Sequence, residues 1–239
     1  QDSAFTPDES ALIVQLDRLV RARRYQDAVD VYEGRSRDDP VITNQRVQAL
    51  VGQAYAGLGP QHRTKARECF KAANSLGYSD VFMARAWFHV ESSSQVGTKE
   101  AIQVCEAFLS KPGRSARDRA EFQSKLANCF HEQARRLRSV SQEKTIEFYS
   151  KSIETYMLAV RIGQDVDQFD GRTLRWLKVP AVEFVQYVGQ DLEPFFSLIE
   201  RLISQKRDIP VEGAEVLMQA LSHSGAARDS GGRSKVAGL

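Results

Sequence analysis

The placement of proline constrains this chain more than any other feature of its sequence. Proline is tolerated in the first turn of a helix but disrupts a helix interior, because it lacks an amide proton and clashes with the preceding turn. The prolines are Pro7, Pro40, Pro60, Pro112, Pro180, Pro194 and Pro210. Between them lie segments rich in Ala, Leu, Glu, Gln, Arg and Lys, which are good helix formers. We find no convincing run of alternating apolar and polar residues that would favour strands, so the sequence predicts an all-α fold.

The first helix has a clear start signal. Thr6 suits the N-cap position, Pro7 suits the first helical position, and Glu9 stands where a capping box would place it. This pattern predicts a helix over residues 8–22.

Small residues recur along the chain, each followed four residues later by a larger side chain. The four pairs are Ala28 and Tyr32, Ala66 and Phe70, Ala101 and Cys105, and Ser152 and Tyr156. Successive pairs are 38, 35 and 51 residues apart. Two helices approach closely only where small side chains meet, and one helical hairpin cannot bury its apolar face alone. The pattern therefore predicts a series of stacked hairpins.

The second of these hairpins is similar to the tetratricopeptide repeat (TPR) family. It has an aliphatic residue, a glycine and an aromatic residue at Val51, Gly52 and Tyr55, followed by the spacing Ala-x3-aromatic-x2-Ala from residue 66. The resemblance covers residues 8–163 and implies a right-handed α-solenoid of TPR-like helical hairpins. The longest spacing predicts an insertion around residues 138–143. An irregular helical bundle, with Ala and aromatic residues as ordinary core, is the alternative.

The chain is predicted to have three parts. Residues 1–163 would form four TPR-like hairpins, and residues 164–223 a degenerate repeat or capping helices. In that second part we expect a helix over 172–188 interrupted at Pro180, an amphipathic helix over 191–206 and a short helix over 211–222. Residues 224–239 are rich in Gly and Ser and predict a flexible tail. The first residue is not Met, which is compatible with a piece of a longer, multidomain protein.

The sequence carries no pattern that indicates catalysis. The four histidines are isolated, and no metalloprotease, serine-hydrolase, phosphate-loop or dinucleotide-binding motif occurs. We therefore expect no enzyme, no cofactor and no metal. Cys69, Cys105 and Cys129 form no CxxC pair and are expected to be buried core residues in a reducing, cytoplasmic environment. No apolar run reaches the ~20 residues that a membrane span needs.

The TPR resemblance implies that the first helix of each hairpin lines a concave groove. The residues that it would place in this groove are Asp17, Arg46, Gln53, Lys125, Asn128, His131 and Arg135. Hydrogen-bonding side chains on a rigid surface suit a peptide or a helix of another protein, including an acidic one. The match to the carboxylate clamp of some TPR proteins is poor, because Ile13 and Asp17 stand where Lys and Asn would be needed. We therefore expect a protein-binding scaffold or regulatory module, but not one that binds chaperone tails.

Two alternatives follow from other residues. Residues 111–138 carry eight basic and three acidic side chains, although the net charge of the whole chain is only +2. The basic patch would comprise Arg114, Arg117, Arg119, Arg136, Arg138, Arg172, Arg175 and Lys178. With Trp176 among them, these residues favour nucleic-acid binding as the second hypothesis. Self-association through an apolar face at Phe195 and Phe196 is the third.

Overall fold

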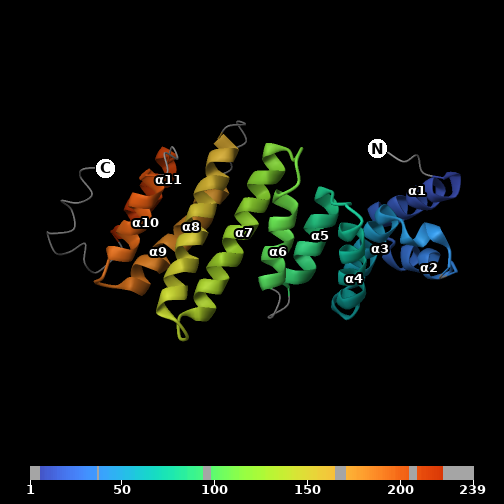
Figure 1. The fold of residues 1–239 in the computed structure, drawn as a ribbon, viewed down its shortest axis with the longest axis horizontal. Helices are drawn as coiled ribbons and strands as arrows, with labels where there is room; N and C mark the ends of the chain where they lie inside the picture. The colour runs from blue at the N-terminus through green and yellow to red at the C-terminus, as the bar shows by residue number, and fades with distance from the viewer. Residues whose placement is uncertain (1–5, 37, 94–97, 165–170, 205–208, 223–239) are drawn as a thin grey trace. The chain divides into compact units, whose positions relative to one another are not determined.

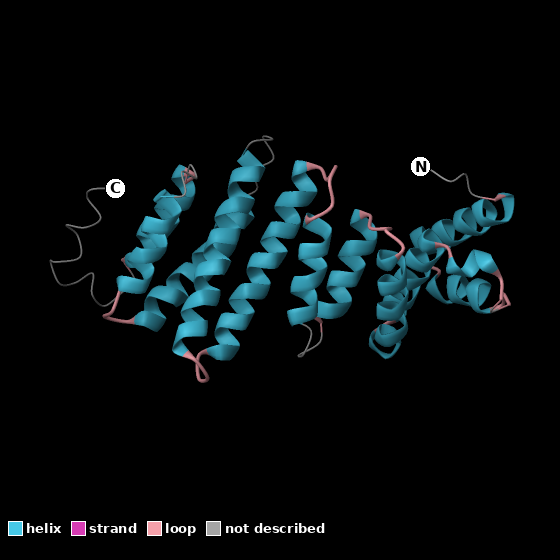
Figure 2. Cartoon of the chain, viewed as in Figure 1, coloured by secondary structure: helices cyan, strands magenta, loops and turns pink. Residues whose placement is uncertain are grey.

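The computed structural model describes residues 6–36, 38–93, 98–164, 171–204 and 209–222. Over these residues the chain forms eleven α-helices and two short 3-10 helices, without a strand (Figures 1 and 2). The α-helices are α1 (Pro7–Arg21), α2 (Tyr25–Glu33), α3 (Gln45–Leu58), α4 (Arg63–Ser75), α5 (Val81–Ser92), α6 (Thr98–Leu109), α7 (Ala116–Leu137), α8 (Gln142–Gln164), α9 (Gly171–Val188), α10 (Glu193–Ser204) and α11 (Val211–Leu221). The predicted all-α class is confirmed. The predicted tail, residues 224–239, lies outside the described residues.

The chain divides into two compact units. Unit 1 comprises Gln1–Val104 and contains α1 to α5 and the first half of α6. Unit 2 comprises Cys105–Leu239 and contains the rest of α6 and α7 to α11.

Polar caps begin several of the helices. At α1 the capping box is present as predicted: the backbone amide of Glu9 donates to Thr6 Oγ1, and the amide of Thr6 donates to Glu9 Oε2. Asn44 accepts two backbone hydrogen bonds at the start of α3, and Ser115 accepts one at the start of α7. Such caps satisfy amide groups that have no partner inside the helix.

In unit 1, α3 is the central helix and contacts α1, α2, α4 and α5. The crossing of α3 and α4 depends on Gly52, because a Cβ atom at this position would lie 2.7 Å from the ring of Phe70. Phe70 is fully buried and stacks with Trp87 of α5, with ring centroids 6.1 Å apart. The glycine and the aromatic residue of the predicted hairpin therefore meet at the close approach of two helices.

In unit 2, α7 and α8 form a long antiparallel hairpin against which α9 packs. Ser152 Oγ of α8 donates to the carbonyl of Ala127 of α7 at 2.8 Å, in a buried position where small residues let the helices approach. The core continues through Tyr149 and Phe184 to Phe195 of α10, which is fully buried. Phe195 cannot therefore supply an exposed face for self-association, so the prediction that placed it on such a face is wrong; Phe196 is partly exposed.

Two predictions about helix boundaries are also wrong. No insertion interrupts the hairpin around residues 138–143, because only a tight turn separates α7 from α8, and the extra length lies in helices of 22 and 23 residues. Nor does Pro180 interrupt α9, which runs through it without a break. A proline inside a helix costs about 3 kcal/mol. Leu177 and Phe184, one turn on either side of Pro180, are completely buried, and this packing offsets the cost.

Candidate functional site

Helices α7 and α9 lie side by side and run in the same direction. The ring of Tyr149, near the start of α8, stacks on Phe184, near the end of α9, with centroids 5.5 Å apart, so α9 is antiparallel to α8. Helix α7 is antiparallel to α8 as well, because a tight turn joins them. Arg135, near the end of α7, contacts Glu183 of α9 directly. The two helices therefore share a surface, and residues at the same level along the helix axes lie next to each other on it.

Glu183 is the centre of a polar cluster at the C-terminal half of this surface. Its carboxylate accepts hydrogen bonds from His131 Nε2 at 3.2 Å, from Arg135 Nη2 at 2.8 Å and from the Tyr149 hydroxyl at 3.1 Å. Arg138 donates to both Glu183 and Tyr149. The Glu183 side chain is only 16% exposed, so these contacts replace the water that a carboxylate would otherwise bind.

The charges of this cluster follow from its surroundings. Burial by itself would raise the pKa of Glu183, but the hydrogen bonds from Arg135 and His131 hold that pKa at about 2. Burial lowers the pKa of His131 below its ordinary value, although the adjacent carboxylate opposes this change. At neutral pH Glu183 is therefore a carboxylate, and His131 is a neutral imidazole that donates its Nε2 proton. The cluster joins α7 to α9, and its charged groups are paired with one another.

Helical spacing defines the rest of the shared surface. On α7 the edge that faces α9 carries Ser124, Asn128, His131 and Arg135; the corresponding edge of α9 carries Arg172, Trp176, Val179 and Glu183. We call these eight residues the α7–α9 face. Because Glu183 lies between His131 and Arg135, the register of the two parallel helices puts Trp176 at the height of Ser124 and Asn128.

The N-terminal half of the α7–α9 face is open, in contrast to the half that contains Glu183. Asn128 is exposed, the Trp176 residue is 50% exposed, and Val179 is 45% exposed. Arg175 is the neighbour of Trp176 in sequence and is also exposed. This half therefore presents an aromatic and an aliphatic side chain to solvent beside hydrogen-bonding groups.

The groove residues predicted from the TPR resemblance divide between the two units. His131 and Arg135 belong to the Glu183 cluster, and Asn128 belongs to the open half of the α7–α9 face. Lys125 projects from a neighbouring position on α7, with its Nζ 3.6 Å from Glu121. The structure thus brings four of the seven predicted residues onto one helix, but two of them already bind a carboxylate of the chain.

Unit 1 holds the other three predicted groove residues. Asp17 of α1 pairs with Arg21 of the same helix at 2.7 Å. The pKa of the half-buried Tyr78 is raised, mainly by burial. Arg46 of α3 and Asp17 are both close enough to affect this pKa, Arg46 lowering it and Asp17 raising it. Gln53 is two turns further along α3 and is partly buried. Unit 1 therefore places Asp17 and Arg46 in one region.

The residues of the predicted basic patch are spread along α7 and α9. Arg117 and Arg119 begin α7, whereas Arg136 and Arg138 end it, a separation of about 28 Å between Arg117 and Arg136 at about 1.5 Å per residue. The cations of α9, which are Arg172, Arg175 and Lys178, lie at the height of about residues 122–128 in the middle of α7, because Glu183 lies between His131 and Arg135. The guanidinium of Arg114 lies over the ring of Phe108, 4.2 Å from its centroid.

Sequence reasoning missed Glu183 and Tyr149. Glu183 is 48 residues from Arg135, and no local pattern marks the pair. A partial signal was available, because Glu183 follows Trp176 by seven residues and so shares its helix face.

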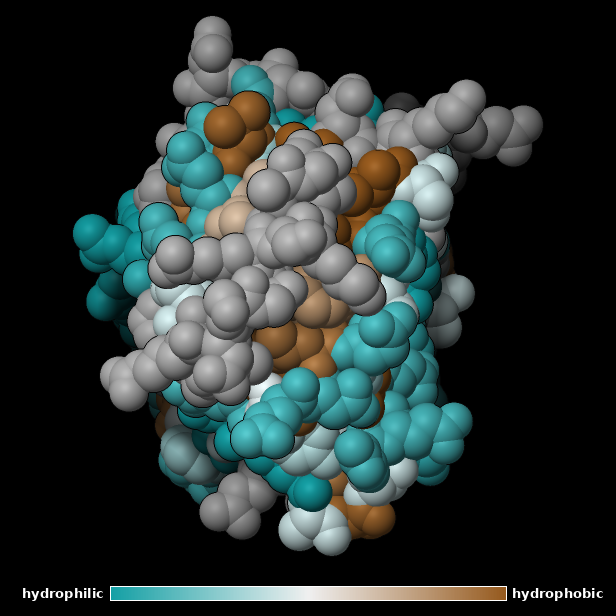
Figure 3. All heavy atoms as spheres, turned by 90° about the vertical axis from the view of Figure 1, so that its left-hand side faces the viewer, coloured by the Kyte–Doolittle hydropathy of each residue, from teal (hydrophilic) through white to brown (hydrophobic). Residues whose placement is uncertain are grey.

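The last three helices expose further hydrophobic side chains. Ile203 is 43% exposed, Val211 is 71% exposed and Met218 is 43% exposed. Hydrophobic side chains are visible among hydrophilic ones when the molecule is viewed from the side on which α9 to α11 lie (Figure 3). Ile203, Val211 and Met218 are spread over α10 and α11, whereas Trp176 and Val179 share one helix face.

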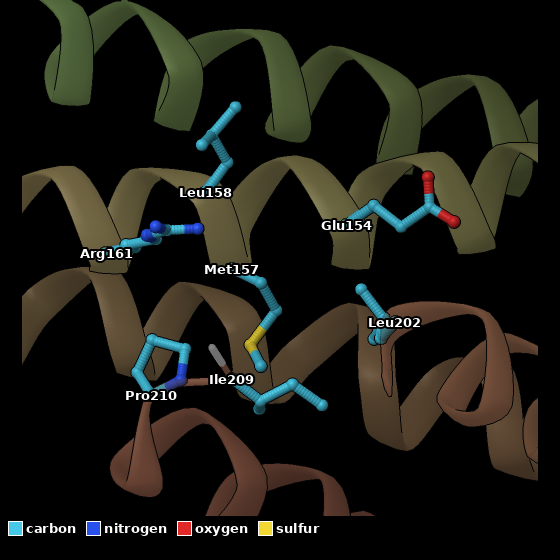
Figure 4. A pocket seen from close by; sticks show the side chains of 7 residues that line it. All are labelled: Glu154, Met157, Leu158, Arg161, Leu202, Ile209 and Pro210. Carbon is cyan, nitrogen blue, oxygen red and sulfur yellow. The ribbon is translucent and has the colours of Figure 1, made fainter. Parts of the chain in front are cut away.

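A small cavity of about 110 Å³ lies in unit 2 (Figure 4). Its lining consists of Glu154, Met157, Leu158, Arg161, Leu202, Ile209 and Pro210. Sites for small molecules usually measure about 300–1,000 Å³, so this cavity has room for no more than a side chain.

No family model matches the chain, and no curated protein matches it significantly. Over the described residues, no group of three or more His, Cys, Asp or Glu side chains could hold a metal ion. None of the helices in that part of the chain is both long and apolar enough to cross a membrane. The interpretation of function therefore depends on the geometry of the α7–α9 face.

Proposed function

We propose that this chain is a protein-binding module that uses the α7–α9 face to hold a peptide or a helix of another protein. The observation that carries the proposal is the exposure of Trp176 next to Val179 on one face of α9. We also propose that the binding face belongs to a TPR-like solenoid, and that the module serves as a scaffold or regulator rather than as a catalyst.

Helix packing within each unit supports the solenoid. In unit 1, α3 contacts both α1 and α5, and in unit 2, α9 contacts both α7 and α11. Alternate helices are therefore neighbours within a unit, while the intervening helices pack against them. A stack of helical hairpins has this arrangement, because each hairpin buries its apolar face against the next one. Gly52 against Phe70, and Ser152 against Ala127, supply the close approaches that such hairpins require.

The side chains of the open half support a protein partner. Trp is highly buried on average, and Trp and Arg are the residue types most enriched among those that dominate binding energy at protein interfaces. Trp176 offers a large rigid ring, and Val179 continues the apolar surface along the same helix face. Asn128 can pair with a backbone or a polar side chain of the partner.

The alternative of nucleic-acid binding has less support. Its arginines are split between the two ends of α7, and Arg138 is engaged by Glu183. Acidic side chains also stand among the cations, since Glu121 and Glu132 lie on the exposed surface of α7. These carboxylates interrupt the row of cations that a continuous phosphate backbone would need, whereas a short peptide segment needs only a few cations. A cytoplasmic location, which suits three buried thiols that form no disulfide, belongs to the same proposal.

The test is affinity capture from native cell extract, with nuclease added to half of each sample. Wild type is compared with Trp176→Ala and with Phe82→Ala, a matched control because Phe82 is 63% exposed on α5 of unit 1. Captured proteins are identified by mass spectrometry, produced in pure form and titrated against all three variants. We expect Trp176→Ala to weaken binding by roughly tenfold or more, as for a central interface anchor. Phe82→Ala should bind like wild type, and circular dichroism should show all three folded.

Two outcomes would contradict the proposal. Equal affinity of folded Trp176→Ala and wild type for the purified partner would remove the α7–α9 face as the binding site. Capture that disappears with nuclease would favour the nucleic-acid alternative.

A further inference from the structure

The structure carries an inference about the chemistry of the partner, which rests on the proposed function. We propose that the open half of the α7–α9 face selects an acidic peptide segment that also has an apolar side chain, with the apolar side chain on Trp176 and Val179 and the acidic groups on the flanking arginines.

The two halves of the α7–α9 face differ in how far their cations are neutralised. In the C-terminal half, Glu183 pairs with Arg135 and Arg138, and Arg135 also contacts Glu132 at 3.3 Å. An incoming acidic group would have to displace a carboxylate that several hydrogen bonds already hold. The cations of this half are therefore neutralised from within the molecule.

Positive charge is in excess around the open half. The segments 114–125 and 172–178, which include the first turns of α7 and of α9, contain seven Arg and Lys residues and two acidic residues. The net charge of these two segments is +5. It is still +2 when Asp165, Asp167 and Asp170, which precede α9 in the sequence, are included. Arg117 and Arg175 are exposed, and neither has an ion pair with a described residue. An acidic partner would therefore be attracted to this end of the face, because the net charge around it is positive.

The apolar side chains of the open half stand between cations in the sequence of α9. Trp176 directly follows Arg175 in the sequence, and Val179 lies one turn beyond Arg175 along α9. A segment made only of acidic groups would leave these side chains uncovered. An acidic segment with one aliphatic or aromatic residue would bury them and pair with the arginines in the same pose. The C-terminal boundary of this pose is the Glu183 cluster.

The experiment titrates the protein with short peptides of defined composition. The first peptide consists of Asp and Glu with one central Leu and has blocked termini. The second has Asn and Gln in place of the acids, and a single-stranded oligonucleotide of equal charge is the third probe. The chain has two tryptophans, of which Trp87 is buried and Trp176 is exposed, so a change in emission reports on Trp176. A Trp176→Phe variant checks this assignment, and anisotropy of labelled peptide gives the affinities.

We expect saturable binding of the acidic peptide at low salt, with an emission change that Trp176→Phe abolishes. The Arg175→Gln variant should bind the acidic peptide roughly fivefold more weakly, the effect of losing one charge contact. Arg136→Gln should bind it like wild type, because Arg136 is also exposed but lies on α7 at the far end of the helix. The neutral peptide should bind more weakly than the acidic one.

Several results would overturn the inference. Equal binding of the neutral and acidic peptides, no binding of the acidic peptide, or no effect of Arg175→Gln would each do so. If the oligonucleotide binds more tightly than the acidic peptide and also depends on Arg175, the ligand of this face is a nucleic acid and not an acidic peptide. If the captured partner still requires Trp176 in any of the first three cases, the proposed function stands and only the acidic class is wrong. If the partner does not require Trp176, both fail.

Discussion

Replacing Glu183 by Gln removes the charge that joins α7 to α9 while keeping the size of the side chain. The variant leaves Arg135, Arg138 and the Tyr149 hydroxyl without their shared acceptor. His131 Nε2 loses the same carboxylate. We expect the free energy of unfolding at pH 7 to fall, because buried and half-buried donors lose a charged partner.

The size of the loss follows from the pKa of Glu183. A carboxyl group with an ordinary pKa of 4.5 titrates at about 2 in the folded chain. This difference corresponds to an upper value of about 3 kcal/mol of stability at neutral pH, at 1.36 kcal/mol per unit. The arginine side chains are 47% and 40% exposed and regain water when the partner is lost. A loss of about 2 kcal/mol is therefore the expected result.

The sign of the pH dependence is defined by the same values. Because the folded pKa of Glu183 is depressed, its stabilisation is fully present above the unfolded pKa near 4.5 and is lost as the pH falls through about 2. The stability difference between wild type and Glu183→Gln should thus be largest at neutral pH and shrink between these two pH values. Other carboxylates titrate in both proteins, so their contributions cancel in the difference.

The assay is urea unfolding followed by circular dichroism at several pH values. Glu147→Gln is the matched control, because Glu147 pairs with Lys151 on the exposed surface of α8 and both side chains are about half exposed. Such a pair contributes about 0.5 kcal/mol or less. A Glu183→Gln variant as stable as Glu147→Gln at pH 7, or a difference that does not change with pH, would refute the reasoning.

Three further outcomes are expected. Gly52→Ala should lower the free energy of unfolding by about 1–3 kcal/mol in thermal or urea denaturation, because the new Cβ would lie 2.7 Å from the buried ring of Phe70; unchanged stability would show that α3 and α4 can separate at no cost. Asn44→Ala should lower it by about 1 kcal/mol through the loss of the α3 cap, and a neutral effect would mean that water replaces the cap. Burial raises the pKa of the Cys69 and Cys129 thiols to about 12, so a thiol-reactive disulfide reagent at pH 8 should modify them only when urea unfolds the chain; rapid reaction in the native state would contradict their burial.

The features that sequence reasoning predicted correctly depend on neighbouring residues. Thr6, Pro7 and Glu9 act within one turn, so their capping box and the start of α1 could be predicted from spacing alone. The short C-terminal helix was also predicted within a residue of its observed end at Leu221. These signals are local, and packing elsewhere in the chain does not alter them.

The features that were missed depend on residues far apart in the sequence. Proline normally ends or kinks a helix, yet α9 continues through Pro180 because buried side chains on both sides hold it in the core. Likewise, His131 and Arg135 were predicted to face a partner, but Glu183 of another helix engages them. Which of several exposed-looking polar residues finds a partner within the fold is a tertiary property that helical periodicity does not encode.

The length of the open half bears on how firmly a partner can be held. The open half, together with the cation Arg117 that precedes it on α7, extends to Asn128 over 11 residues, a distance of about 17 Å along the helix axis. Beyond Asn128 the Glu183 cluster begins, so an extended segment on the open half can be only about five residues long. So short a recognition motif has few contacts with which to slow its release. Partners that carry the motif once should exchange rapidly, and those that carry it several times should gain retention from repeated rebinding.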